Sequence, residues 1–253
     1  MNPLSIGALT FGLTMGGVLV GIWIRTALPE HHVNAESKEA VRIGTGLIAT
    51  ITALILGLVT ASAKSSFDEM DAAIKAGAAD ILTLDRDLAR YGPETAEIRA
   101  ALQDALAAKI DALWPPDSAR RAHTDPGALG HEAEAVADRI RGLSPQNESQ
   151  RWLKTRALEV TEKILATRWQ VVNALGTSVP VVFLAVLLFW LTIIFMNFGL
   201  FAPPNPTVIS ILVVCSLSVA SVIFLILEMN QPFQGLITLS PDPMRYAHSR
   251  MNQ

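Results

Sequence analysis

The chain has 253 residues, of which 51% are hydrophobic and 17% are charged, and its formal net charge is −3. In soluble domains roughly a quarter of all residues are charged. The lower charged fraction here and the mean hydropathy of +0.37 therefore indicate a membrane protein. The central segment 64–176 has 15 basic and 18 acidic residues, which argues against a nucleic-acid partner. The single cysteine, Cys215, gives no disulfide pattern from which a compartment could be inferred.

Four apolar runs carry no charged residue, and each is long enough to cross about 30 Å of hydrocarbon, which takes ~20 residues. The bilayer core contains no water, so every backbone N–H and C=O group must find its hydrogen-bond partner within the protein. Each run is therefore predicted to be a helix. No basic residue precedes the first run, and we therefore interpret it as a span and not as a signal peptide. The runs cover residues 3–23, 43–63, 179–201 and 208–227.

The charged segment between the second and third runs is also predicted to be helical. The expected fold is therefore all-α: an integral membrane protein with four transmembrane helices and a helical cytosolic stalk inserted between helices 2 and 3. Residues 1–63 would form transmembrane helices 1 and 2, 64–176 the cytosolic domain, and 177–228 helices 3 and 4. Residues 229–253 would form a cytosolic tail that packs on the base of the stalk.

Lysine and arginine near the span ends predict the side of the membrane that each loop occupies. The short loop between the third and fourth runs has none, whereas segment 64–176 has fifteen and the tail adds two. We therefore expect both termini and the stalk to be cytoplasmic. Arg25, Lys38 and Arg42 in the first loop count against this orientation.

A single long helix is predicted from about residue 40 to Tyr91, because Gly92–Pro93 is the first strong stop signal after the second run. Outside the membrane its apolar residues repeat every seven positions, a pattern that packs helix against helix. We interpret this face as an oligomer or stalk seam, formed by Phe67, Met70, Ile74, Ile81, Leu84 and Leu88.

Further helices are predicted at 93–113 and 127–143, and from Ser144–Pro145 to about Leu175, with the serine as cap. In the tail, Pro232 is expected to end the fourth span. The apolar piece 235–240 is strand-like and is expected to pack on the stalk. A final helix would begin at Ser240–Pro241 or Asp242–Pro243.

The sequence has no catalytic motif. It lacks a glycine-rich phosphate loop, a cysteine pair and a spaced Ser-His-Asp set, so we expect no enzyme activity and no cofactor. The adjacent His31 and His32 beside Glu30 are typical of a solvated loop, and His131 with Glu134 lacks a third ligand. We therefore expect no metal site.

Polar residues inside the membrane spans are the remaining candidates for function. The second span has a face of small and hydroxyl side chains that continues into the seam, and it indicates either a pore lining or plain helix packing. The pore-lining candidates are Thr45, Ala49, Thr52, Leu56, Thr60 and Ala63. Beyond them, Asp68, Glu69 and Asp71 would form either an acidic ring at a pore mouth, which favours cations, or an ordinary solvated face.

The fourth span has a polar face of its own. Its hydroxyls would either line a water-filled path or bond back to their own helix. The face consists of Ser210, Ser218, Ser221 and Glu228.

Two stretches of the chain resemble a bacterial family of integral membrane proteins described as bestrophin-like. One is RIGTGLIATITALILGLVTASAKSSFDEMDAAIKAGAADILTLDRDLARYG, and the other is LEMNQPFQGLITLSPDPMRYA. The arrangement of two plus two spans around a helical middle is also similar. The resemblance implies kinship to bestrophins, which are oligomeric ion channels with four transmembrane helices per subunit and a helical cytosolic region. It also implies a bacterial inner membrane.

The leading hypothesis is a homo-oligomeric ion channel in the lipid bilayer, with conduction along an axis lined by the second span. The alternative is a non-conducting membrane scaffold or sensor whose cytosolic helices bind a protein partner. In that case the same faces would serve packing alone.

Overall fold

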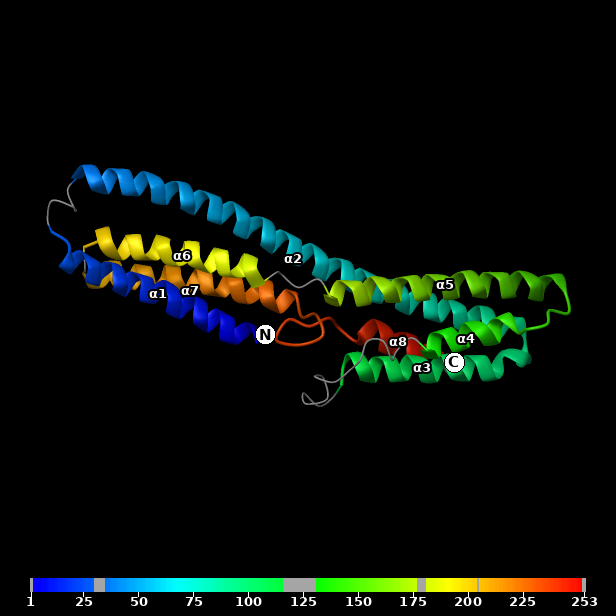
Figure 1. The fold of residues 1–253 in the computed structure, drawn as a ribbon. Coiled ribbons are helices and arrows are strands. Elements are labelled where there is room, and N and C mark those ends of the chain that lie inside the picture. The colour runs from blue at the N-terminus through cyan, green and yellow to red at the C-terminus, as the bar shows by residue number, and fades with distance from the viewer. Residues whose placement is uncertain (1, 30–34, 116–130, 177–180, 204, 252–253) are drawn as a thin grey trace. The chain divides into compact units, whose positions relative to one another are not determined.

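The computed structural model describes residues 2–29, 35–115, 131–176, 181–203 and 205–251. Side chains are described in these ranges except at 35–37, 131–133, 168–176 and 181. All regular structure in the described ranges is helical (Figure 1), which agrees with the predicted all-α class. The chain divides into two compact units. Unit 1 contains Met1–Ser65 and Ser178–Asn230, and unit 2 contains Ser66–Thr177 and Gln231–Gln253.

Unit 1 contains α1 (Pro3–Ala27), α6 (Val181–Phe201), α7 (Pro206–Met229) and the first half of α2 (Ala35–Tyr91). These four helices are long and apolar enough to cross a membrane, which confirms the predicted number of spans. Several helices extend past their expected limits. In particular, α2 begins five residues before the expected start near residue 40.

Asparagine caps explain where two of the membrane helices begin. Asn2 Oδ1 accepts a hydrogen bond from the Leu4 amide at 3.0 Å, and Asn205 Oδ1 accepts one from the Val208 amide at 2.9 Å. A proline follows each asparagine and presets the first helical turn. The fourth span ends at Met229, one residue past the expected limit of 228. Pro232 does not end it, since the helix stops three residues earlier, where Asn230 Nδ2 donates to the Ile226 carbonyl.

Glycines bring α1 and α6 into close contact, and these helices lie side by side with α7 in Figure 1. A Cβ atom on Gly17 would lie 2.7 Å from the Thr192 carbonyl oxygen. A Cβ on Gly21 would collide with the Met196 carbonyl, and one on Gly199 with the Val18 carbonyl. Small residues are what close helix packing in lipid requires, so the α1–α6 contact depends on these three positions.

Unit 2 contains the second half of α2 and four further helices: α3 (Ala96–Leu113), α4 (His131–Arg141), α5 (Glu148–Gly176) and α8 (Asp242–Arg250). The helix predicted at 93–113 starts with a short 3-10 turn, η2 (Pro93–Thr95), before α3. The predicted start of α5 at Ser144–Pro145 is wrong. Asn147 Oδ1 accepts from the Gln150 amide at 2.8 Å, so the asparagine is the capping residue.

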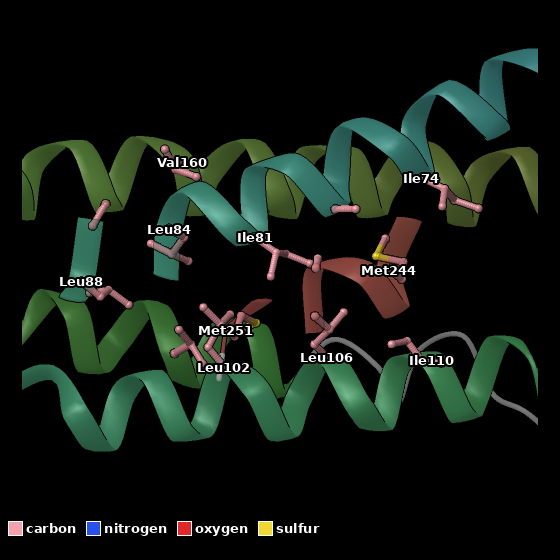
Figure 2. Close-up of a cluster of buried hydrophobic side chains, with 14 of the residues drawn as sticks. Ile74, Ile81, Leu84, Leu88, Leu102, Leu106, Ile110, Val160, Met244 and Met251 are labelled. Atoms are coloured by element: carbon pink, nitrogen blue, oxygen red, sulfur yellow. The ribbon is translucent and has the colours of Figure 1, made fainter. Parts of the chain in front are cut away.

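The six seam residues lie in the core of unit 2. Five of them are buried, and Phe67 is half-buried against the same cluster. Figure 2 shows the side chains of Ile74, Ile81, Leu84 and Leu88 among those of α3, α5 and α8. Burying a leucine completely stabilises the fold by about 1.5–3 kcal/mol, and both Leu84 and Leu88 are only 1% exposed.

Two buried aspartates of α2 form ion pairs with neighbouring helices. Arg99 of α3 binds Asp85 with Nε at 2.7 Å and Nη2 at 3.1 Å, and Arg156 of α5 binds Asp87 at 3.1 Å. The hydrogen bonds to Asp85 raise the pKa of the Arg99 guanidinium above its ordinary value. The guanidinium therefore stays charged, and the buried carboxylate keeps its partner.

The C-terminal tail belongs to unit 2. Trp114 Nε1 donates to the Leu239 carbonyl at 2.8 Å, and the Trp114 ring meets the Phe233 ring edge-on at 5.4 Å. The piece 235–240 forms no strand, and within it Leu239 is buried while Leu236 is 82% exposed. The final helix begins at Asp242–Pro243, the second of the two expected starts.

Candidate functional site

One face of α2 is covered within unit 1. Thr45 and Thr52 are buried, and both hydroxyls have partners. Asn197 Nδ2 of α6 donates to Thr45 Oγ1 at 3.0 Å, and Thr52 Oγ1 donates to the Ile48 carbonyl at 2.7 Å. These two pore-lining candidates therefore lie on the side of α2 that faces its own chain.

The other four pore-lining candidates range from half-buried to buried. Leu56 packs against the cluster of Ile6, Leu184 and Ile223. Thr60 Oγ1 donates to the Leu56 carbonyl at 2.8 Å. Ala49 and Thr60 are half-buried and border the open side of the helix, whereas Ala63 is buried.

The opposite side of α2 is exposed in the single chain, and its two flanks differ. One flank has large apolar side chains, with Leu47 64% and Leu58 62% exposed. The other flank has only small residues, and a Cβ atom built on Gly46 or Gly57 would meet no other atom within 4 Å. This small flank consists of Gly46, Thr50, Ala53 and Gly57. None of these four residues was among the pore-lining candidates predicted from the sequence.

The three acids predicted at a pore mouth differ in their surroundings. Asp68 and Glu69 are exposed on α2. Asp71 is half-buried, and Lys75 Nζ donates to its Oδ2 at 2.6 Å. A partner one turn along the helix partly offsets the charge of Asp71.

The serines of the predicted polar face of α7 bond to their own helix. Ser210, Ser218 and Ser221 are exposed, and each hydroxyl donates to the carbonyl four residues before it at 2.8–2.9 Å. Glu228, at the end of this face, is buried. Hydroxyls that bond back in this way are common in membrane helices and need no water-filled path.

A buried polar contact between α1 and α7 was not predicted. The hydroxyl oxygens of Thr14 and Ser216 lie 2.6 Å apart, and both residues are at most 1% exposed. Hydroxyls that bond across helices stabilise packing in lipid. The sequence signal was present as threonines spaced four apart in the first span, at positions 10 and 14.

Within the part of the chain that the structure describes, no three His, Cys, Asp or Glu side chains are placed to hold a metal ion. The pair His31–His32 with Glu30, and the side chain of His131, lie outside the described residues.

Unit 1 is a bundle of apolar helices in which α2 has one face covered by its own chain and one open face.

A family model described as Bestrophin-like domain matches residues 12–244. The chain belongs to the bestrophin-like family. The predicted resemblance is therefore confirmed over most of the chain. No curated protein matches the sequence.

Solved structures share the bestrophin-like fold at low sequence identity. A point mutant of a bacterial bestrophin homologue from Klebsiella pneumoniae is 15% identical and superposes with a TM-score of 0.68 over 96% of this chain and 94% of its own. A second mutant of the same homologue is 16% identical, with a TM-score of 0.69 over 99% and 97%. The structure phased by Zn-SAD is 16% identical, with a TM-score of 0.63 over 94% of each chain. These likenesses establish the fold.

Proposed function

We propose that this chain is one subunit of a homo-oligomeric ion channel in which α2 lies next to the conduction axis. Membership of the bestrophin-like family supports a channel, because bestrophins form oligomeric ion channels. The observation that carries the proposal is the exposure of α2. In the most apolar stretch of α2 only 11% of the residues are buried within the chain, whereas in that of α1 the share is 39%. A span with so little cover from its own chain has most of its surface left for other copies and for a central path.

The pore lining in this proposal is the small flank of α2. Small side chains leave room for a path, and Thr50 adds a hydroxyl. Ala49 and Thr60 border this flank and keep their predicted role. Thr45, Thr52 and Ala63 are buried against the same subunit, so we assign them to packing. The large apolar flank with Leu47 and Leu58 would then face lipid or a neighbouring copy.

The exposed Asp68 and Glu69 and the half-buried Asp71 are together proposed to favour cations near one end of this path. Rings of carboxylates raise the local concentration of cations. Replacing Asp68 by Asn should shift the reversal potential under a salt gradient towards that of anions. Lys75→Ala would free the Asp71 carboxylate and should shift the potential in the opposite direction.

Cysteine accessibility tests the proposed lining. The single cysteine, Cys215, is exposed on α7, so the experiment starts from a Cys215→Ala background. Ala53→Cys places a thiol on the small flank, and Leu58→Cys places a matched thiol on the large flank. Currents are recorded in a planar bilayer while a charged, membrane-impermeant thiol reagent is added.

The reagent should reduce the current through Ala53→Cys and leave that through Leu58→Cys unchanged. The reverse pattern would show that the large flank lines the path. A folded oligomer that stays silent in all conditions would contradict the channel and favour the scaffold. If the protein were a scaffold, a partner protein could bind at Trp152 of α5. This side chain is 60% exposed, and the Arg156 guanidinium lies 5.5 Å from the centre of its ring.

A further inference from the structure

We propose that a cavity between α2 and α6 binds an anionic phospholipid, with the phosphate at a basic rim and an acyl chain on an apolar floor. The cavity has a volume of about 620 Å³ and lies within unit 1, between the segment 38–49 of α2 and the end of α6. It shares Gly46 with the small flank of the proposed channel, and Ala49, which borders that flank, also lines it. Binding there does not require that the protein conducts ions.

The floor of this α2–α6 cavity is apolar. Phe198 and Phe201 of α6 line it together with Ala49 of α2. Thr45 and Asn197 also line the cavity, and their side chains hydrogen-bond to each other at 3.0 Å. Phe198 is 43% exposed although it belongs to a membrane helix. Gly46 also lines the cavity, and a Cβ atom on it would meet open space. Apolar cavities hold water poorly, whereas hydrocarbon chains fill such a space favourably.

The rim of the cavity is basic. Lys38 and Arg42 line it one helical turn apart, and the Arg42 side chain is 82% exposed. The carboxylate near them belongs to Glu39. Its Oε2 lies 3.7 Å from Arg42 Nη1, and the side chain is 64% exposed. Exposed pairs of this kind are weak, so a phosphate can compete with Glu39 for the guanidinium.

A third cation lies at the same end of unit 1. Arg25 Nη1 donates to the carbonyl of Ala202, a residue that lines the cavity, at 2.7 Å. The described lining therefore has two cations, Lys38 and Arg42, and one carboxylate, Glu39, and Arg25 adds a third cation next to the lining residue Ala202. Basic pockets between membrane helices bind anionic headgroups in this way.

A phospholipid matches both halves of the cavity. A free phosphate would use the rim and leave the apolar floor open. A neutral lipid would cover the floor and leave the cations unmatched. The cavity also lies where apolar spans end, and that is the depth at which a lipid carries its phosphate.

Native mass spectrometry of the delipidated full-length protein can count bound lipids. Phosphatidylglycerol and phosphatidylcholine with the same acyl chains are added at equal concentration. We expect phosphatidylglycerol to bind in preference to phosphatidylcholine. In Lys38→Ala/Arg42→Ala, binding of phosphatidylglycerol should weaken by about 25-fold, because each basic residue contributes roughly a factor of five. The melting temperature of this double variant in phosphatidylcholine should equal that of the unmodified protein, since both replaced side chains are exposed.

Two further variants separate the cavity from general surface charge. Gly46→Leu fills the floor without changing any charge and should also reduce phosphatidylglycerol binding. Arg86→Ala/Lys163→Ala removes two exposed basic residues of unit 2 and should leave binding unchanged.

Four results would overturn the proposal. The two lipids could bind equally well, or Gly46→Leu could bind phosphatidylglycerol like the unmodified protein. Inorganic phosphate could displace phosphatidylglycerol at equal concentration, which would make the rim a free-anion site. Finally, Gly46→Leu could change the number of copies in the oligomer, which would assign the cavity to a contact between subunits.

Discussion

Tyr91, the last residue of α2, is 5% exposed, and its hydroxyl has no hydrogen-bond partner among the described residues. A buried polar atom without a partner costs about 1–3 kcal/mol. Tyr91→Phe removes the oxygen and keeps the ring, so it should raise the free energy of unfolding by about 1 kcal/mol. Chemical denaturation followed by circular dichroism would measure the change.

The control for this prediction is Tyr246→Phe in α8. Tyr246 is 57% exposed, and its hydroxyl accepts only an exposed hydrogen bond from Arg250 Nε at 3.2 Å, so the free energy of unfolding should change by no more than about 0.5 kcal/mol. Destabilisation by Tyr91→Phe would contradict the prediction and would indicate that a bound water satisfies the buried hydroxyl.

At the scale of single residues, the sequence indicated which side chains are polar within the spans but not their partners. The serines of α7 were predicted either to line a path or to bond back to their helix, and local geometry alone produces the second arrangement. The contact between Thr14 and Ser216 depends on the register of α1 against α7. That register is a tertiary property, so the spacing of the threonines at positions 10 and 14 marks a polar face of α1 but does not identify Ser216 as the partner.

The contact between α1 and α6 yields a prediction at the scale of helices. Gly199→Ala should destabilise unit 1 by several kcal/mol, because the added methyl group meets the backbone of α1 and forces the helices apart. The change can be measured by thermal unfolding in detergent micelles. For comparison, overpacking a core typically costs 1–3 kcal/mol even where side chains can yield.

Gly12→Ala is the matched control. A Cβ atom on Gly12 of α1 would meet no other atom within 4 Å. Alanine favours a helix over glycine by about 1 kcal/mol, so this variant should be neutral or more stable. If the two variants behaved alike, helix propensity and not close contact would explain the effect of Gly199.

At the scale of helices, the sequence predicted the types and most limits of the elements. Long apolar runs and Gly92–Pro93 are strong signals, and they gave the four spans and the end of α2. The predicted start of α5 was wrong because two possible capping residues, Ser144 and Asn147, lie within four residues of each other. Gln150 decides between them: its amide bonds to Asn147, and its side-chain oxygen accepts from the Gln146 amide at 2.7 Å.

At the scale of the whole molecule, periodicity predicted which residues of α2 share a face but could not orient the helix. Thr45 and Thr52 share a face with Ala63, as expected. The sequence did not show that this face is the one covered by the same chain. The small flank could be recognised only after the covering helices were in place.

The tail gives a prediction for the whole molecule. Ending the chain after Gln231 removes Leu239, Met244, Ala247 and Met251 from the core of unit 2. Each large apolar residue removed from a core costs about 2–5 kcal/mol, so the truncated unit 2 should lose its protection from hydrogen exchange. Unit 1 keeps all its own contacts and should remain protected within lipid nanodiscs.

A chain ending at Met251 serves as the control and should behave like the full-length protein. Full protection of unit 2 in the longer truncation would mean that the tail is not part of its core. Loss of protection in both units together would show that they unfold as one.

The packing of α1 has a consequence for the timing of synthesis. Its contacts are with α6 and α7, and residues 28–180 separate it from the start of α6. At 5–20 residues per second, the ribosome needs about 8–30 s to make that stretch. During this interval α1 lies in the bilayer with Gly17 and Gly21 turned towards a helix that does not yet exist. Lipid or an insertion factor must cover these glycines first, and the bundle assembles only when the last third of the chain arrives.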